Sequence, residues 1–537
     1  MTAQGRARAA QTVAGGALLI TLVTIVSRVF GLGRWAVQAS EVGSTGVGEA
    51  YAVANLLPNV LFEVVAGGAL AGAIVPVAAG AIARRAHLDV SRSASAMLTW
   101  TLAALVPVGL LVALLAPQIV AVLPRVGDPA LHDVSVLLLR VFSIQVPLYG
   151  VSVVAAGILQ AHRRFFWPSA APILSTVVVI ASYLVFGALA DGHQTSPEML
   201  SSASLAWLAW GSTAGVVALS LPLLIPVHRA GVRLRLTFSF PPGEAARARS
   251  LAFAGIGALL AQQASVVVLL LVANSHGEGG AYPVFQYAQA VYLLPYAVLA
   301  VPLATSAFPH LTEHAATGDG DRFGRLAAVS VRGVAIVSVA GAALLVAAAG
   351  PIEAFFGFTT GGAAHMATAI TWLAPGAVGL ALVFHVSRIL YATNHARAAV
   401  TAASCGWLVV AVGSAVGAWV LVTGHDTDAV FRVMGGASSL GMTVGAVLLL
   451  RAVREHLGPA PLVGVGRTIG ITLVTAAGVC VVLRRLAGSL APSGAGTWQG
   501  AWVALLVGAA ALAVVLVVGF LVDRAALRGL VGGEAHG

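Results

Sequence analysis

The sequence contains no lysine and few charged residues of any kind. Its 29 basic residues are all arginine, and charged residues make up only 9% of the 537 positions. A soluble protein of this length is expected to be about 25% charged. The deficit extends along the whole chain, 59% of which is hydrophobic, with a mean hydropathy of +0.95. This composition excludes a soluble domain with a single anchor and predicts an all-α, polytopic membrane protein.

Cysteine is nearly absent, and the common catalytic motifs are missing. Cys405 and Cys480 lie far apart in apolar runs, so we expect neither a disulfide framework nor a metal site. The HLTEH stretch at 310–314 matches a zinc-protease pattern but lacks a third ligand, and we expect no zinc there. No P-loop, nucleotide fingerprint or nucleophile elbow is present, so we do not expect ATP hydrolysis within this chain. No cofactor is expected. We attribute the net charge of +10 to cytoplasmic loops rather than to nucleic-acid binding.

Apolar stretches of about 20 residues, separated by charged or Pro/Gly-rich breaks, predict fourteen membrane helices. They lie near residues 13–37, 48–83, 94–123, 133–161, 168–190, 203–228, 249–274, 281–315, 324–349, 364–393, 398–423, 428–453, 464–487 and 498–522. The first follows a basic segment without a cleavage site, so we expect it to be retained. The second and eighth exceed one crossing, so we expect them to tilt, to bend at Pro58 and Pro295, or to project from the bilayer.

The distribution of arginine orients these helices. With the N-terminus in the cytoplasm, 21 of the 29 arginines fall in cytoplasmic segments, and four fall in external ones: Arg125, Arg432, Arg484 and Arg485. Cytoplasmic loops of membrane proteins are enriched in arginine, so both termini are expected to be cytoplasmic. The pair at 484–485 departs from this pattern.

Two segments of the chain recur in the same order. Residues 51–76 resemble 287–309, and residues 156–165 resemble 387–396, at offsets of 237 and 231 residues. A repeat of six helices enters the membrane twice in the same orientation, which predicts two pseudo-symmetric six-helix lobes with a substrate path between them. The expected domains are an N-terminal lobe (1–237), a C-terminal lobe (238–456), and two further helices with a cytoplasmic tail (457–537).

Charged side chains within the first two spans require an explanation. A guanidinium near the bilayer centre costs about 2.5–3.5 kcal/mol, and Arg28 lies roughly 22 Å along its span. Arg34 follows it, and span two carries Glu49 and Glu63 near one helix face. Arg28 and Glu63 could form an ion pair that only fixes packing. Alternatively, the arginines line a watery cavity and bind an anionic group such as a phosphate. We attribute Arg140 and Arg388 to snorkelling or packing.

Four motifs give the sequence a family resemblance. They are SRVFGLGR, AYAVANLLPNVLFEVVAGGALAGAIVPV, AGILQAHRRFFWPSAAPIL and LLPYAVLAVPLATSAFPHL, which follow in order through the first ten spans. Together they resemble the MurJ (MviN) family of lipid II flippases, within the multidrug/oligosaccharidyl-lipid/polysaccharide exporter superfamily. Glu63 and the glycines at 67–68 are similar to the actinobacterial branch.

The resemblance implies a fold and a set of site residues. It implies two lobes around a V-shaped central cavity, with helices thirteen and fourteen forming a groove for the lipid tail. Arg28, Arg34 and Glu49 match the family's charged cavity residues. Where some family members carry a basic pair, this chain has Phe62 and Glu63. Where they carry Asp-Arg on helix eight, it has Gln289 and Ala290. The glutamate of their Ala-Glu-Gly-Ala motif is replaced by Gly67. The implied substrate-binding set is Arg28, Arg34, Glu49, Asn59, Glu63 and Gln289.

The same resemblance implies a function. The chain is expected to flip lipid II, the undecaprenyl-pyrophosphate disaccharide-pentapeptide of peptidoglycan synthesis, across the bacterial plasma membrane by alternating access. Cell-wall growth and cell shape would depend on it, and it would be a transporter rather than an enzyme. Its expected partners are lipid II, membrane lipids and, as candidates, cell-wall synthesis enzymes, with no nucleic acid. The alternatives are an exporter of another polyprenyl-linked glycan, a drug antiporter of the superfamily, or a non-transporting cell-wall scaffold.

Overall fold

The computed structural model describes residues 27–28, 30–65, 74, 87–123, 129–240, 256–492 and 495–526. Within these ranges every regular element is a helix, and the chain divides into two compact units, Met1–Leu259 and Leu260–Gly537. Twelve helices there are long and apolar enough to cross a membrane, and they correspond in order to the third to fourteenth expected spans. The expected spans 13–37 and 48–83 lie partly outside the described residues.

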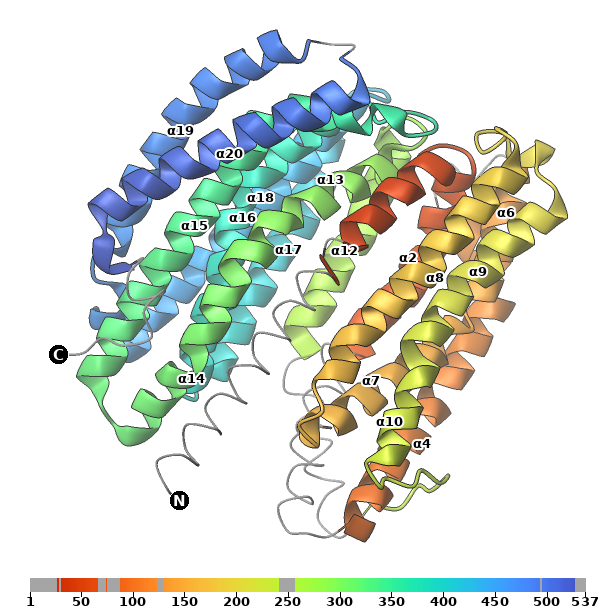
Figure 1. Cartoon of the computed structure of the whole chain (residues 1–537), viewed down its shortest axis with the longest axis horizontal. Helices are drawn as coiled ribbons and strands as arrows, with labels where there is room; N and C mark the ends of the chain where they lie inside the picture. The colour runs from red at the N-terminus through yellow and green to blue at the C-terminus, as the bar shows by residue number, and fades with distance from the viewer. Residues whose placement is uncertain are drawn as a thin grey trace, which may run out of the picture. The chain divides into compact units, whose positions relative to one another are not determined.

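The first unit is built from helices that pack side by side (Figure 1), and its buried apolar residues form two clusters. Its residues 30–41 are helical, and the contacts that shape the unit are those of α8 with α9, α4 with α7 and α2 with α6. Phe142, Tyr183 and Phe186 are fully buried in one of these clusters. The elements after residue 41 are α2 (Val47–Glu63), α4 (His87–Leu114), α5 (Ala116–Ala121), α6 (Pro129–Phe142), α7 (Gln145–Ala161), α8 (Phe166–Ala190), η2 (Pro197–Met199), α9 (Ser202–Ser220), η3 (Leu221–Leu223) and α10 (Leu224–Arg229).

Proline interrupts two of the expected spans. The helix expected to reach residue 123 ends at Leu114, and the short α5 follows with Pro117 in its first turn. That end of the prediction was therefore wrong. The span expected at 133–161 consists of α6 and α7, which are separated at residues 143–144. Pro147 has no N–H to donate to the carbonyl of Ser143, so an uninterrupted helix would lose a hydrogen bond there.

The second unit is organised around its longest helix, α15 (Gly320–Phe355). This helix packs against α14, α16, α19 and α20, and most of its residues are buried. The α19–α20 pair, the C-terminal hairpin, lies against it (Figure 1). The other elements are α12 (Ile256–His276), α13 (Ala281–Pro295), η4 (Tyr296–Ala300), α14 (Val301–Thr317), η5 (Phe356–Phe358), α16 (Met366–Ala392), α17 (Ala396–Leu421), α18 (Thr427–Leu457), η6 (Ala460–Leu462), α19 (Val465–Leu490) and α20 (Thr497–Val522).

Helices α17 and α18 approach so closely that glycine is required at their crossing. A Cβ atom added to Gly441 would lie 2.5 Å from the carbonyl oxygen of Gly406, and one added to Gly406 would lie 2.9 Å from that of Gly441. Helices without a hydrophobic driving force between them associate through such close backbone packing. This contact therefore depends on the absence of side chains.

The repeated sequence segments adopt the same helix endings. Helix α7 is followed by a left-handed residue, Arg163, and α16 is followed by Asn394, 231 positions later. After each, a backbone N–H returns to a carbonyl five residues earlier, from Arg164 to Leu159 at 2.8 Å and from His395 to Leu390 at 2.8 Å. This is the Schellman pattern of hydrogen bonds. In the other repeat, a π-helical turn follows Pro295 directly, and π-helical residues 64–65 follow the helix that contains Pro58.

Candidate functional site

The two arginines of the first expected span differ in exposure. Arg28 is exposed, whereas Arg34 is half-buried on helix 30–41, with its guanidinium carbon 4.8 Å from the ring centre of Trp35. Such a cation–π contact leaves the N–H groups at the edge of the guanidinium available for an anionic ligand. Within the described part of the chain, neither guanidinium group is paired with a carboxylate.

Glu49 is buried in the first turn of α2. A carboxylate at this place interacts favourably with the positive end of the helix dipole, so Glu49 stabilises the start of α2. The backbone N–H of Val47 donates to the carbonyl of Gln194 at 3.0 Å and joins this end of α2 to the loop after α8. Glu49 is thus held at a fixed point of the first unit.

The remaining predicted residues of α2 lie at its other end. Asn59 and Glu63 are both exposed, roughly 15 and 21 Å along the helix axis from Glu49. Among the described residues, Glu63 forms no ion pair with Arg28, so the pairing considered from sequence does not occur. Gln289 is half-buried on α13 of the second unit.

Sequence analysis missed a buried polar network that holds helix 30–41 in place. The hydroxyl oxygens of Tyr51 and Tyr183 are 2.9 Å apart, and Tyr183 donates to Oε1 of Gln38 at 3.2 Å. Tyr51 also lies 3.2 Å from Oγ of Ser212. Gln38 follows Arg34 by one helical turn, so the network fixes the face that carries Arg34. Tyrosine and glutamine within apolar spans were the sequence signal for it.

Arg388 behaves as the packing interpretation expects. The guanidinium carbon of Arg388 lies 3.6 Å from the ring centre of Phe384, and Nη1 donates to the carbonyl of Phe384 at 3.4 Å. Arg140 is exposed on α6. Neither observation points to a ligand.

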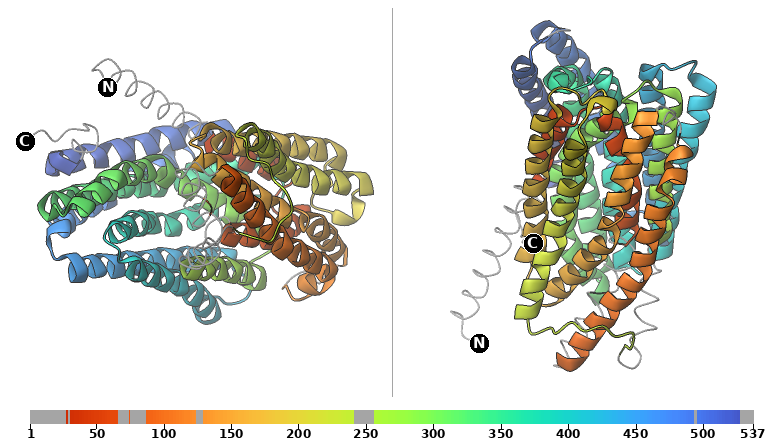
Figure 2. Two further views of the ribbon diagram at one scale, coloured as in Figure 1. Left: turned by 90° about the horizontal axis from the view of Figure 1, so that it is seen from below. Right: turned by 90° about the vertical axis from the view of Figure 1, so that its right-hand side faces the viewer.

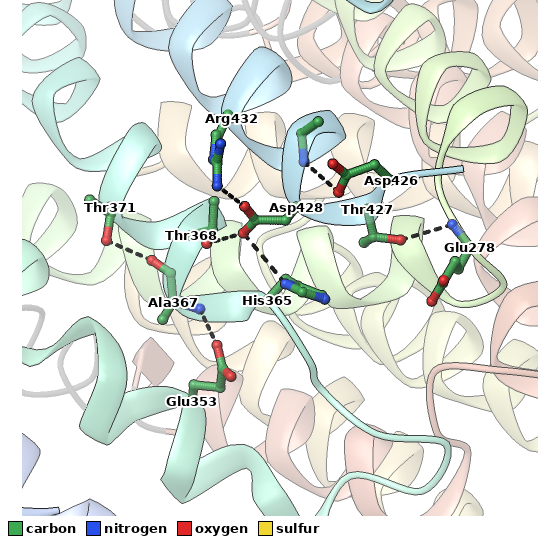
Figure 3. Close-up of polar contacts among 11 residues, drawn as sticks. Glu278, Glu353, His365, Ala367, Thr368, Thr371, Asp426, Thr427, Asp428 and Arg432 are labelled. Carbon is green, nitrogen blue, oxygen red and sulfur yellow. Dashed lines mark hydrogen bonds and ion pairs between the residues drawn. The ribbon is translucent and has the colours of Figure 1, made fainter. Parts of the chain in front are cut away.

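A polar cluster at one end of the second unit includes Arg432, one of the four arginines expected in external segments. Asp428 contacts Arg432, accepts a hydrogen bond from Thr368 at 2.5 Å, and lies 3.4 Å from Nδ1 of His365 (Figure 3). Glu353 accepts from the backbone N–H of Ala367 at 2.6 Å in the same view. The positive charge of Arg432 is thus neutralised by Asp428.

An ion pair fastens the C-terminal hairpin to α15. Nε of Arg332 lies 2.5 Å from Oδ2 of Asp523, and both side chains are only 13% exposed. Thr468 at the start of α19 donates to Asp523 at 3.1 Å, and Nη1 of Arg332 donates to the carbonyl of Val463 at 2.5 Å. One pair of charges therefore connects α15, the start of α19 and the end of α20.

An apolar cavity of about 480 Å³ lies in the second unit between α15, α16, α18 and α19. Its lining includes Ala342, Pro375, Leu382, Val447, Leu473 and Cys480. Thr443 is the one lining residue with a hydroxyl group. A space with this lining favours a hydrocarbon ligand, since a charged group would lack hydrogen-bond partners there.

Sequence comparison places the chain among known transporters. The family model described as "Lipid II flippase MurJ" matches residues 38–507. The probable lipid II flippase MurJ of Synechocystis sp. is 28% identical over 43% of either chain. The lipid II flippase MurJ of Burkholderia cenocepacia is 25% identical over 82% of either chain. The family match covers Glu49, Asn59, Glu63 and Gln289 and begins after the two arginines.

Solved structures support the fold. A structure of the lipid II flippase MurJ in an inward closed conformation covers 95% of this chain and 100% of its own, with a TM-score of 0.73 and 17% identity. An inward-facing multidrug resistance MATE transporter of the MOP superfamily covers 82% of this chain and 98% of its own, with a TM-score of 0.65 and 13% identity. The fold is therefore that of this transporter superfamily.

Proposed function

We propose that this chain, which belongs to the lipid II flippase MurJ family, moves lipid II from the inner to the outer leaflet of the bacterial plasma membrane. The observation that carries the proposal is the family match over residues 38–507, which includes most of both units. The chain is a multi-pass membrane transporter rather than an enzyme. Peptidoglycan synthesis, and with it cell shape, would depend on this step.

The proposed architecture extends the twelve described spans to fourteen. It comprises a six-helix lobe at 1–237, a second at 238–456 and the last two helices at 457–537, with both termini in the cytoplasm. The lobes would enclose a V-shaped cavity and alternate in access. Support comes from the arginine distribution and from the helix endings shared at an offset of 231 residues.

The pyrophosphate of the substrate would bind Arg28 and Arg34. Guanidinium groups donate paired hydrogen bonds to phosphate oxygens and stay charged, and the described residues leave both without an ion-pair partner. Glu49 would fix the local geometry, while Asn59, Glu63 and Gln289 would contact the sugar or peptide. The apolar cavity beside α19 suits a segment of the polyprenyl tail.

Complementation of a flippase-depleted strain tests the arginine roles. We expect Arg28→Ala and Arg34→Ala to abolish growth while the proteins remain inserted and folded. Arg140→Ala, which removes an exposed arginine from α6, is the matched control and should support growth. Normal growth of both single variants and of the Arg28→Ala/Arg34→Ala double variant would refute pyrophosphate binding by these residues.

A second candidate is export of another polyprenyl-linked glycan or of a drug. The structural similarity to a multidrug resistance transporter supports this second candidate. Reconstituted protein given lipid II, a teichoic-type lipid or a cationic drug distinguishes the cases. Lipid II flipping alone supports the main proposal, and transport of the other substrates without lipid II would replace it. Association with cell-wall synthesis enzymes is a further proposal, which affinity purification from membranes would test.

A further inference from the structure

Residues 232–240 form an extended strap that crosses from the end of α10 to α4 (Figure 2). A turn at Gly231, with φ of 82°, reverses the chain and starts it. Apolar side chains alternate with polar ones along the strap, in the sequence VRLRLTFSF. This alternation gives an extended segment one apolar and one polar face.

A ladder of hydroxyl groups on α4 holds the strap. The backbone N–H groups of residues 233, 235 and 237 donate to Ser91, Ser95 and Thr99 at 3.2, 3.0 and 3.0 Å. Two extended residues advance about 6.6 Å and four helical residues about 6.0 Å, so the two spacings nearly match. An extended chain can lie against a membrane helix only if its N–H groups are paired, and these hydroxyls pair three of them.

The strap runs along α4 in the direction from Ser91 to Thr99, and its own residues change from charged to apolar in that direction. Arg233 and Arg235 lie level with Ser91 and Ser95, near the start of the membrane-spanning part of α4. Farther along, Leu236 is 84% exposed and Phe238 is 59% exposed. The order of charge followed by exposed apolar side chains is the order of headgroups and acyl chains in a bilayer.

Trp100 joins the strap at its apolar end. Its indole N–H donates to the carbonyl of Phe238 at 3.0 Å, and the two rings meet edge to face with centres 5.2 Å apart. Exposed tryptophan is enriched at the boundary between headgroups and hydrocarbon. Its position supports the depth assigned to the strap.

Positive charge gathers at this end of the first unit. Arg92 donates to Ser239 at 3.1 Å, and Arg164 donates to the carbonyl groups of Pro226 and Arg229 at 3.4 Å. Within the described residues 87–100, 158–165 and 224–240, Asp89 is the one carboxylate, against Arg92, Arg163, Arg164, Arg229, Arg233 and Arg235. Such a field attracts anions.

We propose that the strap is a binding surface for the anionic phospholipids of the surrounding bilayer. Arg92, Arg233 and Arg235 contact the lipid phosphates, while Leu236 and Phe238 insert among the acyl chains. The hydroxyl ladder keeps the arginines at headgroup depth. The role is separate from substrate transport and does not rest on it.

The full-length protein in nanodiscs of phosphatidylcholine with increasing phosphatidylglycerol tests the proposal. The measurement is the rise of the unfolding midpoint with the phosphatidylglycerol fraction. An arginine at an anionic surface favours contact by about fivefold, so replacing all three should weaken the apparent affinity for phosphatidylglycerol by roughly 100-fold. We expect the Arg92→Gln/Arg233→Gln/Arg235→Gln variant to lose most of the rise seen for the unsubstituted protein.

Two further variants distinguish lipid binding by the strap from a general effect of positive charge. The matched control replaces three exposed arginines of the second unit, Arg325→Gln, Arg397→Gln and Arg451→Gln, and should keep the lipid response. Ser95→Ala with Thr99→Ala keeps every arginine but unpairs two strap N–H groups, and should reduce the response.

Several results would overturn the proposal. They are an unsubstituted protein indifferent to phosphatidylglycerol, a triple variant with full response, or a control variant with equal loss. Lipid II added to pure phosphatidylcholine nanodiscs should not raise the unfolding midpoint as phosphatidylglycerol does. If it does so through the same arginines, the surface binds the substrate instead.

Discussion

The ion pair between Arg332 and Asp523 gives a direct prediction about the C-terminal hairpin. Asp523 follows α20 and also accepts hydrogen bonds from Thr468 and from the backbone N–H of Ala526 at 3.1 and 3.0 Å. Asp523→Asn keeps the size of the side chain and one carbonyl oxygen but removes the charge. The guanidinium of Arg332 then remains largely buried without its counter-charge.

The magnitude follows from the burial of the pair. Removing one partner of a fully buried ion pair costs about 3–5 kcal/mol. The 13% exposure of both side chains, and the hydrogen bond that Arg332 retains to Val463, reduce this cost. We therefore expect Asp523→Asn to lower the free energy of unfolding by roughly 2–3 kcal/mol.

Unfolding of the purified protein in detergent measures the effect, with Arg332→Gln and the double variant completing a cycle. The matched control is Asp319→Asn, because Asp319 also pairs with an arginine, Arg322, at the start of a helix. That pair is 67% and 35% exposed, and asparagine preserves the cap on α15, so its loss should cost at most about 0.5 kcal/mol.

The coupling energy between Arg332 and Asp523 tests this prediction. A value near that of the exposed control pair would show that the hairpin is held by apolar packing alone, and the reasoning from burial would be refuted. A destabilisation of Asp523→Asn that persists unchanged in the Arg332→Gln background would lead to the same conclusion.

Two further predictions concern contacts inside single units. Tyr183→Phe removes the hydroxyl bonded to Gln38 and should lower the free energy of unfolding by about 1–2 kcal/mol. The control Tyr391→Phe, at an exposed tyrosine, should have little effect. Equal thermal unfolding of the two variants would contradict this prediction. Gly441→Leu would place a side chain on the backbone of Gly406 and should lower the yield of folded protein in size-exclusion chromatography. A monodisperse and equally stable variant would show that α17 and α18 can separate without cost.

The site could be predicted from the sequence only in part. Charged residues within an apolar span are conspicuous, so the sequence singles out Arg28, Arg34 and Glu49 as candidates, and their role in binding stays a prediction. Their surroundings were not, because the partners of a side chain depend on which helices become neighbours. The alternative pairing of Arg28 with Glu63 failed for this reason, since spacing along one helix says nothing about the adjacent one.

The sequence by itself determined the membrane class, the position of most spans and the repeated segments. These follow from the length of apolar runs and from local backbone preferences, which involve residues within a few turns. Only the tertiary structure decided contacts between distant residues, such as the Arg332–Asp523 pair, the Tyr51–Tyr183 bond and the hydroxyl ladder beneath the strap. Hydrogen bonds and ion pairs act over a few ångströms, so they exist only after packing has brought their groups together.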